Sequence, residues 1–415
     1  MSDYIVGLDI GSSKVCMAVG RTQVNGEIQI IGLTSVQCEG IKKAVVVDID
    51  KTSQAILECK KQIEKIVDID IKEVFLSLPS SICQLVWNKG IVVISSDDKE
   101  VKESDIERVL ESAKMITVPN NMKIIGVEPL QYIIDGYENI KEPIGMSGNR
   151  LELDSFVILA EDTVINNLFK SITKAGIIIK SNVFQPTALS KTVLKKGELE
   201  IGAVIVDVGS ETTDISIFKD GKLLFNESLT VGGNTITSDI SLCLKLMINE
   251  AEKLKIMHGD LSMQEVNNKI KISGAYNNEV EIEQSLLNEI IYARVEEILL
   301  MIKESIINSG YYDELSGIVI VGGGLGAFKG SLELTRKILN KPCRIENGKF
   351  IGVSNPIYVG AISVVNDVYE YYSQQFKEIA CDDDKIDETI NEEIEDSDKM
   401  TGIISKFKRF IEEFF

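Results

Sequence analysis

The chain has 415 residues, a formal net charge of −20 and 44% hydrophobic residues, as expected of a globular protein large enough for two or three domains. The negative charge argues against nucleic-acid binding, which depends on Lys and Arg neutralising phosphates. No apolar run approaches the ~18 residues of a membrane-spanning helix. Residues 1–8 have neither the basic nor the apolar region of a secretory signal, so a cytosolic location is expected.

Cysteine and histidine usage excludes several kinds of site. The seven cysteines form no C-x-x-C pair, so neither a disulfide framework nor a zinc site is expected. The chain has a single histidine, His258, so a metal site built from several histidines is excluded and a His-dependent hydrolase mechanism is not expected.

Hydrophobic periodicity predicts an α/β chain with a duplicated plan. The first part alternates strands with a helix, a second part changes to short strands around one helix, and the strand and turn pattern then begins again near residue 202. The expected strands are 5–11, 14–21, 28–36, 73–78 and 202–208, and the expected helices are 52–67, 103–114, 162–175 and 187–194.

Two segments repeat one design, an apolar strand that runs into Asp-x-Gly and then into hydroxyl side chains. They are Leu8 to Lys14 and Val206 to Asp214. Glycine allows a tight turn that presents backbone N–H groups to a phosphate, and Ser or Thr hydroxyls add donors. An acidic residue beside a phosphate is explained by a hydrated Mg²⁺ between them. The repeat therefore predicts two halves that close on one phosphate chain.

A third glycine-rich element follows an apolar strand at Gly322, Gly323 and Gly324. Alone it also fits the dinucleotide fingerprint G-x-G-x-x-A, with Glu346 near the place of the ribose-binding acid. All three elements together favour one nucleotide held between two domains. No G-x-x-x-x-G-K-[ST] motif is present, so P-loop chemistry is not expected.

The end of the chain divides into an acidic segment and an amphipathic one. Residues 381–398 contain ten acidic residues and one lysine, a composition typical of an extended linker. The last residues place their apolar side chains at helical spacing, which predicts an amphipathic helix that inserts into an anionic membrane surface. Its membrane-facing residues would be Ile403, Ile404, Phe407, Phe410, Ile411, Phe414 and Phe415.

Taken together, these motifs resemble the actin-like ATPase superfamily and, within it, the FtsA family of bacterial division proteins. The resemblance covers nearly the whole chain and is most specific in the insertion segments 131–136 and 143–148 and in the amphipathic tail. It implies a two-lobed actin-like fold with an FtsA-type inserted subdomain. The implied division is 1–82 with 160–195 for the first lobe, 83–159 for the insertion, 196–240 with 311–376 for the second lobe, 241–310 for a small subdomain, 377–399 for the linker and 400–415 for the membrane helix.

The resemblance also implies a site for ATP and Mg²⁺. Asp9 and Asp207 would orient the metal through water, and Gln185 would position the attacking water. The phosphates would be lined by Gly11, Ser12, Ser13, Lys14, Gly209, Thr212 and Thr213, and the nucleoside by Gly233, Asn234, Glu252, Lys255, Gly323 and Gly324.

Further implications concern partners and place. Members of this family assemble into filaments, bind the FtsZ C-terminal tail and tether FtsZ to the cytoplasmic face of the membrane at the division septum, together with other divisome proteins. The FtsZ tail would dock on residues 241–310, where Arg294 is a candidate contact.

One departure from the family pattern bears on activity. The second phosphate loop usually reads Asp-x-Gly-Gly-Gly-Thr, and here Ser210 and Glu211 replace two glycines. A carboxylate adds repulsion beside the phosphates, so at most weak ATP hydrolysis is expected. A pilus-assembly protein of the same fold and an actin-fold small-molecule kinase remain alternatives.

Overall fold

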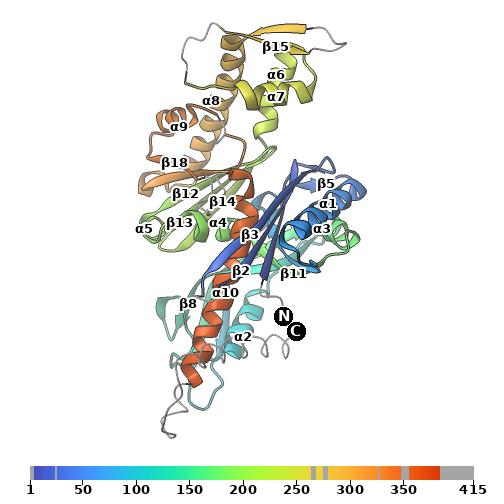
Figure 1. Ribbon diagram of the computed structural model, residues 1–415. Coiled ribbons are helices and arrows are strands. Elements are labelled where there is room, and N and C mark those ends of the chain that lie inside the picture. The colour runs from blue at the N-terminus through green and yellow to red at the C-terminus, as the bar shows by residue number, and fades with distance from the viewer. Residues whose placement is uncertain are drawn as a thin grey trace, which may run out of the picture.

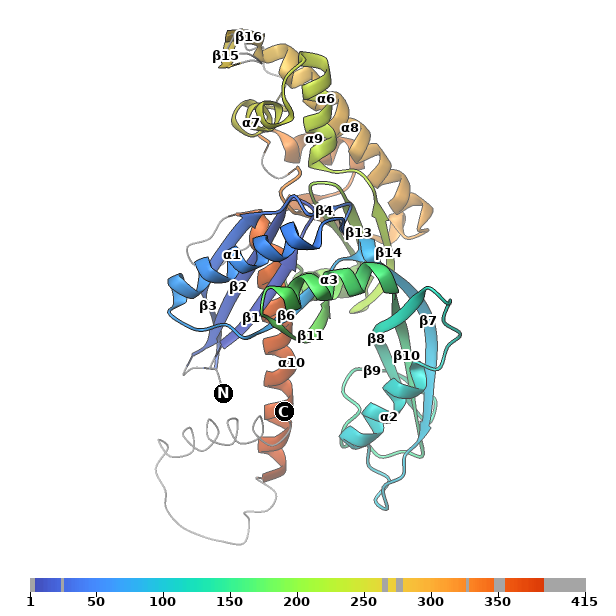
Figure 2. The same ribbon diagram turned by 90° about the vertical axis from the view of Figure 1, so that its right-hand side faces the viewer.

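The computed structural model describes residues 4–23, 26–262, 268–273, 279–325, 328–346 and 355–383. It has two lobes, each built on a five-stranded sheet, with a third sheet inserted into the first lobe (Figures 1 and 2). Among the helices described, none has the length and apolar character required to cross a membrane.

The first lobe has the strand order β11-β6-β1-β2-β3. Its strands are β1 (Tyr4–Ile10), β2 (Lys14–Thr22), β3 (Ile28–Gln37), β6 (Glu73–Leu78) and β11 (Ile178–Phe184). Helices α1 (Ile49–Val67) and α3 (Asp162–Lys174) pack on one face, and α4 (Gln185–Val193) and α10 (Val359–Asp383) cover the other. A small hairpin, β4 (Ile41–Lys42) and β5 (Val45–Val46), precedes α1.

The second lobe repeats this plan with the order β14-β13-β12-β17-β18. Its strands are β12 (Ala203–Val208), β13 (Thr213–Lys219), β14 (Lys222–Leu229), β17 (Gly317–Val321) and β18 (Cys343–Ile345). The helices are α5 (Lys196–Ile201), α6 (Gly233–Leu244), α7 (Ile248–His258), α8 (Gln284–Asn308) and α9 (Ser331–Leu339), with a hairpin of β15 (Lys269–Ser273) and β16 (Glu279–Glu283). Buried Val, Ile and Leu side chains from β12, β13, β17 and α8 form one continuous core.

The insertion is a four-stranded sheet with one helix on its face. Its order is β7 (Cys83–Val93), β10 (Arg150–Glu161), β8 (Met122–Ile134) and β9 (Tyr137–Ile140), with α2 (Glu103–Ala113) packed on it. The sequence predicted short strands here, but β7, β8 and β10 have 11, 13 and 12 residues. Their burial does not alternate with a period of two, because α2 covers only part of the sheet. The length of these strands therefore could not be predicted from hydrophobic alternation.

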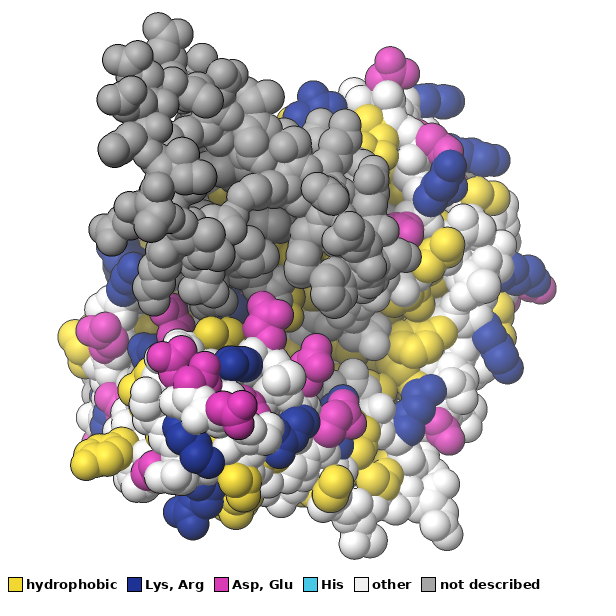
Figure 3. Space-filling view, turned by 90° about the horizontal axis from the view of Figure 1, so that it is seen from below, with side chains coloured by type: hydrophobic (Ala, Val, Ile, Leu, Met, Phe, Trp, Pro, Cys, Tyr) yellow, Lys and Arg dark blue, Asp and Glu magenta, His cyan; other side chains and the backbone are white. Residues whose placement is uncertain are grey.

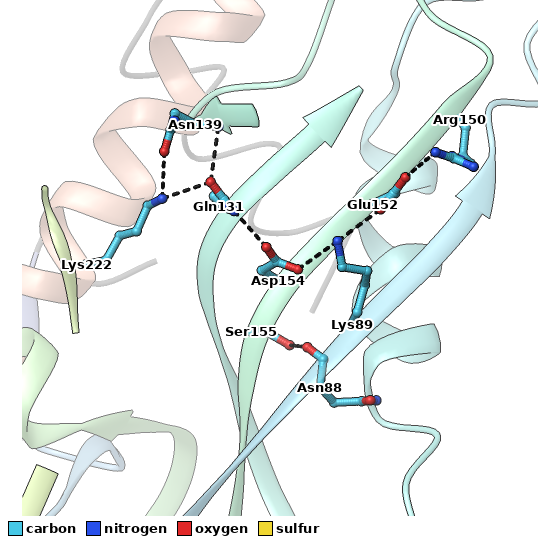
Figure 4. Close-up of polar contacts among 9 residues, drawn as sticks. All are labelled: Asn88, Lys89, Gln131, Asn139, Arg150, Glu152, Asp154, Ser155 and Lys222. Atoms are coloured by element: carbon cyan, nitrogen blue, oxygen red, sulfur yellow. Dashed lines mark hydrogen bonds and ion pairs between the residues drawn. The ribbon is translucent and has the colours of Figure 1, made fainter. Parts of the chain in front are cut away.

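The insertion also contacts the second lobe, through a lysine at the β13–β14 turn. The Lys222 ammonium donates to Gln131 Oε1 (2.8 Å) and Asn139 Oδ1 (2.7 Å) of the inserted sheet. From there a polar chain crosses the sheet from Gln131 to Asp154 and on to Lys89 (Figure 4). The insertion therefore connects the two lobes.

Helix α10 differs from the predicted domain division. Residues up to 376 were predicted to belong to the second lobe, but α10 packs on β1, β2 and α4 of the first lobe. Gly7 permits this, because a Cβ there would lie 2.4 Å from the Ala361 carbonyl oxygen. The helix also continues to Asp383, so the segment predicted as linker from residue 377 begins as helix. The rest of the linker and the amphipathic segment 400–415 lie outside the described residues.

Candidate functional site

The two Asp-x-Gly segments form equivalent β-turns at facing edges of the lobes. The Gly11 N–H donates to the Lys14 carbonyl, and the Gly209 N–H donates to the Thr212 carbonyl, both at 2.9 Å. The strands flanking these turns pair in the same antiparallel register, β1 with β2 and β12 with β13. The repeated residues thus form the same local structure twice.

The carboxylates before these turns are close enough to influence each other across the lobes. Burial raises the pKa of Asp9 to about 6, and the nearby Ser77 hydroxyl opposes this shift. The pKa of Asp207 rises further, to about 8, because burial is reinforced by the negative charges of Asp214 and Asp9. Asp214 lies opposite Asp207 in the β12–β13 pair, and burial raises its pKa to about 6.

This acidic pair fits a hydrated divalent cation. Two half-buried carboxylates from different lobes, each with a raised pKa, would be stabilised in their charged form by a cation between them. Mg²⁺ accepts such a site, since it keeps several waters and uses one or two carboxylates together with phosphate oxygens. Asp9 and Asp207 would hold it, and the ion would neutralise phosphate charge.

Gln185 and Asp9 meet at the start of α10. Gln185 is the first residue of α4 and is 6% exposed. A Cβ added to Gly360 would lie 2.5 Å from Asp9 Oδ2 and 3.1 Å from Gln185 Nε2. The structure therefore brings the predicted water-positioning residue beside the predicted metal-orienting carboxylate, with a glycine that leaves room for both.

Three glycine segments of the second lobe pack into one backbone cradle. The Gly233 N–H donates to the Gly209 carbonyl (3.0 Å), and the Gly324 N–H donates to the Val208 carbonyl (2.8 Å). A Cβ at Gly324 would lie 2.6 Å from the Gly209 carbonyl oxygen. Gly322 has a φ of +85°, a left-handed conformation that suits glycine. The third glycine-rich element thus belongs to the same cleft as the second hairpin.

Two lysines from different lobes add positive charge to this cleft. Lys255 is 7% exposed, and its ammonium contacts the Gly233 carbonyl (3.0 Å), Thr237 Oγ1 (2.7 Å) and Glu252 Oε2 (2.5 Å). Burial lowers its pKa, Glu252 opposes that shift, and the charge of Lys14 adds to it. Lys14 is therefore near enough for its charge to affect Lys255 across the cleft.

The remaining predicted site residues have different surroundings. Ser12 Oγ accepts a hydrogen bond from the Ala44 N–H (2.9 Å), the Ser13 carbonyl accepts one from Cys38, and the Asn234 N–H donates to the Ser210 carbonyl (2.7 Å). Thr212 lies beside Gly209, and Gly323 lies against Ile357. Thr213 differs from the prediction, because it is fully buried and its hydroxyl donates to the Val231 carbonyl (2.8 Å). It supports the loop and does not offer that donor to a ligand.

Arg294 is already engaged within the protein. Its guanidinium contacts Asp239 of α6 at 2.5 Å and 3.2 Å and also pairs with Glu297. The guanidinium is charged as in any arginine, and the Asp239 carboxylate raises the pKa of Arg294 further. Arg294 therefore ties α8 to α6, and a docking partner would meet this ion pair and not a free cation.

Sequence reasoning missed a turn of the first lobe that contacts both phosphate hairpins. Lys43 and Ala44, between β4 and β5, both have positive φ (48° and 62°). The Lys43 N–H donates to Glu211 Oε2 (2.5 Å), and Ala44 contacts Ser12. Such turns usually contain Asn-Gly or Asp-Gly, and the Lys43-Ala44 sequence does not predict one. Gly360 was missed as well, since it lies at the start of a helix without a motif.

Comparison with known proteins decides the family. Residues 204–363 match the family described as "Cell division protein FtsA", and residues 82–159 match the one described as "SHS2 domain inserted in FTSA". The cell division protein FtsA of Enterococcus faecalis is 34% identical over 90% of this chain and 84% of its own length. The chain belongs to the FtsA family of cell division proteins. The FtsA of Borreliella burgdorferi is 30% identical over 96% of this chain and 98% of its own.

Solved structures confirm the actin-like fold expected of an FtsA family member. A type IV pilus biogenesis complex of PilM and PilN superposes with a TM-score of 0.63 at 15% identity, covering 88% of this chain and 98% of the other. MreB5 of Spiroplasma citri bound to ADP gives 0.53 at 13% identity, covering 91% and 99%. At such low identity these likenesses show the fold alone. The predicted fold class and the resemblance to FtsA are both confirmed.

Proposed function

We propose that this FtsA family member binds ATP with Mg²⁺ between its lobes and assembles with its own copies into filaments. It tethers FtsZ filaments to the cytoplasmic face of the membrane at the division septum, where it helps to recruit other divisome proteins. The observation that carries the nucleotide part is the pair of equivalent hairpins, which bring Asp9 and Asp207 close enough across the lobes for the charge of Asp9 to raise the pKa of Asp207. MreB5, which shares the fold, is bound to ADP in one structure and to AMPPNP in another.

Each lobe has a defined part in holding the nucleotide. Gly11, Ser12, Ser13 and Lys14 would bind the phosphates from the first lobe, and Gly209 and Thr212 from the second. The paired Glu252 and Lys255 carboxylate and ammonium lie beside Gly233, where they can bind the nucleoside together with Asn234, Gly323 and Gly324. Gln185, beside Asp9, would orient the attacking water. Glu211 in the phosphate loop makes the chain a nucleotide-dependent scaffold with at most weak ATPase activity.

Membrane attachment is assigned to the C-terminal amphipathic segment. On the lower face of the molecule, where its described side chains are visible, positive and negative groups are interspersed and form no single basic field (Figure 3). The segment 400–415 in contrast combines an apolar face with Lys406, Lys408 and Arg409, the composition of an interfacial helix. One such helix binds weakly, but a filament multiplies the contacts and so the apparent affinity.

FtsZ docking is assigned to the small subdomain at the other end of the molecule. Helix α10 runs away from the cleft toward the insertion, while α6, α7 and α8 lie at the opposite end (Figures 1 and 2). A partner bound near Arg294 would thus be separated from the membrane-directed end by the length of the body. This arrangement suits an adaptor that joins two surfaces.

Flotation with anionic vesicles tests the proposal. The full chain and a chain ending at Lys399 are compared over a concentration series with Mg-ATP, with and without FtsZ. We expect cooperative flotation of the full chain, flotation of FtsZ only in its presence, and loss of both on truncation. Phe407→Glu should abolish binding because it puts a charge on the apolar face, whereas Glu413→Gln on the polar face should preserve it.

Other outcomes favour the alternative functions. Equal flotation of the two chains, or none of either, would remove the tail from the account and favour a pilus-assembly role. Formation of a phosphorylated product from ATP and a small-molecule acceptor, without vesicle binding, would favour a kinase.

A further inference from the structure

The turn at Lys43 and Ala44 is anchored at its base by backbone hydrogen bonds of the first lobe. Gly40 receives hydrogen bonds from the N–H groups of Val47 (2.9 Å) and Asp48 (3.0 Å), which close the hairpin at its base. Asp48 in turn caps α1 by accepting from the Lys51 N–H (3.0 Å). Two successive positive φ values then direct neighbouring N–H groups toward the cleft, an arrangement that binds anions.

Those two N–H groups contact the two phosphate hairpins, one each. Ala44 donates to Ser12 of its own lobe (2.9 Å), and Lys43 donates across the cleft to the Glu211 carboxylate of the second lobe (2.5 Å). The other oxygen of Glu211 accepts from Asn234 Nδ2 (3.5 Å). The carboxylate of Glu211 therefore accepts hydrogen bonds from both lobes at the same time.

Glu211 belongs to the loop that would bind the phosphates, which gives this contact a consequence. Gly209 and Thr212, which flank Ser210 and Glu211 in the turn, are hydrogen-bonded to each other, so the Glu211 side chain lies at the tip of the hairpin. Asn234, its second donor, is also a nucleoside-binding candidate. A terminal phosphate that entered between the hairpin tips would meet a negative charge and would compete with it for the Lys43 N–H.

We propose that Glu211 is a resident anion of the phosphate cleft, which clasps the lobes together through Lys43 and makes the site prefer a nucleoside diphosphate to a triphosphate. This inference rests on the proposed nucleotide site and specifies its selectivity. A diphosphate leaves the Glu211–Lys43 contact in place, whereas a triphosphate must displace it. The clasp also joins the lobes when no nucleotide is bound.

The test separates the contact from its effect on binding. Hydrogen exchange of the backbone amides in residues 41–46 is followed in the nucleotide-free full chain, and the Kd values of Mg-ADP and Mg-ATP are measured by calorimetry. The variants are Glu211→Gly, which removes the carboxylate, and Glu211→Gln, which keeps its shape without the charge. Ser210→Gly is the matched control, because it restores the other glycine of the family pattern and leaves the clasp intact.

We expect Glu211→Gly to speed exchange at Lys43 by about tenfold and to improve the affinity for Mg-ATP relative to Mg-ADP by about tenfold, since charge-assisted hydrogen bonds have effects of this size. Glu211→Gln should change the exchange rate at Lys43 and the relative affinity for Mg-ATP in the same direction but by a smaller factor. This variant provides the test if Glu211→Gly does not fold. Ser210→Gly should change neither.

Three results would overturn the inference. Unchanged exchange at Lys43 in Glu211→Gly would mean that the clasp does not form in solution. Faster exchange with an unchanged ratio of the two Kd values would remove the selectivity while leaving the nucleotide site itself intact. If neither nucleotide binds to any variant, the proposed nucleotide function fails together with the selectivity, and the exchange data still report on the contact.

Discussion

Within the cleft, single glycines leave room for the side chains that would hold the cation. At Gly360 a Cβ would lie 2.5 Å from Asp9 Oδ2, and at Gly322 it would lie 2.4 Å from Asp207 Oδ1. The two carboxylates thus have similar surroundings in the two lobes. Each lies close to a glycine from later in the chain, Gly360 of α10 for Asp9 and Gly322 after β17 for Asp207. Their placement depends on the absence of a side chain as much as on the hairpins that carry them.

Replacing Gly360 tests this requirement at one residue. We expect Gly360→Ala to weaken Mg-nucleotide binding and to lower the free energy of unfolding by about 1–3 kcal/mol, because the added methyl group forces Asp9 and Gln185 to move. Calorimetry and urea unfolding measure the two effects. Gly197→Ala is the control, since nothing lies within 4 Å of its Cβ position. Normal nucleotide binding by Gly360→Ala would show that the site tolerates the displacement.

The raised pKa of Asp207 predicts how stability changes with pH without Mg²⁺. The folded protein holds this proton up to about pH 8, whereas an unfolded Asp loses it near 3.8. Stability should therefore fall as pH rises between these values, because the folded state binds more protons. Asp9, Asp214 and Glu128, whose pKa values burial raises to about 6, 6 and 7, add to the same trend.

The contribution of Asp207 is isolated by comparison with Asp207→Asn. Urea unfolding in EDTA from pH 5 to 8.5 should show the variant gaining stability over the parent as pH rises, and Mg-ADP should reduce that difference by stabilising the carboxylate. A difference that stays constant with pH would contradict the account.

At the scale of elements, the insertion is held by more than its two connections to the first lobe. Lys222, at the start of β14, reaches Gln131 and Asn139 on the inserted sheet (Figure 4). Gly221 lies against Lys141 of the same subdomain. The second lobe thus contacts the insertion through this β-turn, and also through an apolar cluster that contains Ile158 of β10 with Phe218 and Leu223. Movement of one should therefore be transmitted to the other.

Removal of this contact should loosen the insertion locally. We expect Lys222→Ala to increase hydrogen exchange in residues 131–140 by several-fold and to lower the free energy of unfolding by about 1 kcal/mol, as two hydrogen bonds are lost. The control is Lys219→Ala, because Lys219 pairs with Lys222 across the turn but binds Glu314 of its own lobe (2.7 Å). Equal exchange in the two variants would show that Lys222 does not hold the insertion.

The sequence predicted those elements whose signal is local. Leu8 to Lys14 and Val206 to Asp214 identified both hairpins, since Asp-x-Gly after an apolar strand has a direct structural meaning. The position of α10 could not be found this way, because its amphipathic pattern says which face is buried but not which lobe covers it. The turn at Lys43 and Ala44 could not be predicted either, because neither residue type favours positive φ. Its two N–H groups contact Glu211 and Ser12, which are distant in the sequence. The role of Thr213 likewise depends on a distant partner, because its hydroxyl donates to the Val231 carbonyl.

In the whole molecule, one buried apolar cluster among the described residues spans both lobes, with Phe184 and Leu189 of the first and Ile205 and Phe218 of the second. Several polar contacts add to it. The first-lobe segment η1 (Ser80–Ile82) bonds to β14 through Ser80 and Asn226 (2.8 Å), the insertion bonds through Lys222, and the hairpin tips meet at Glu211. Helix α10 starts against Asp9 and extends along the first lobe to Asp383. The cleft is therefore joined by one helix to the beginning of the C-terminal segment, so the proposed nucleotide site and the proposed membrane anchor are connected through one element.

The most direct test of the account is whether one cation depends on carboxylates from both lobes. The Kd of nucleotide is measured with and without Mg²⁺ for the parent chain, Asp9→Asn, Asp207→Asn and the double variant. We expect each single change to weaken Mg²⁺-dependent binding by about 10–100-fold, as for other groups that orient metal-bound water, and the double variant to lose little more, because the two act on one ion. Nucleotide binding that is unaffected by either change, or losses that simply add, would contradict a single metal-nucleotide site closed by both lobes.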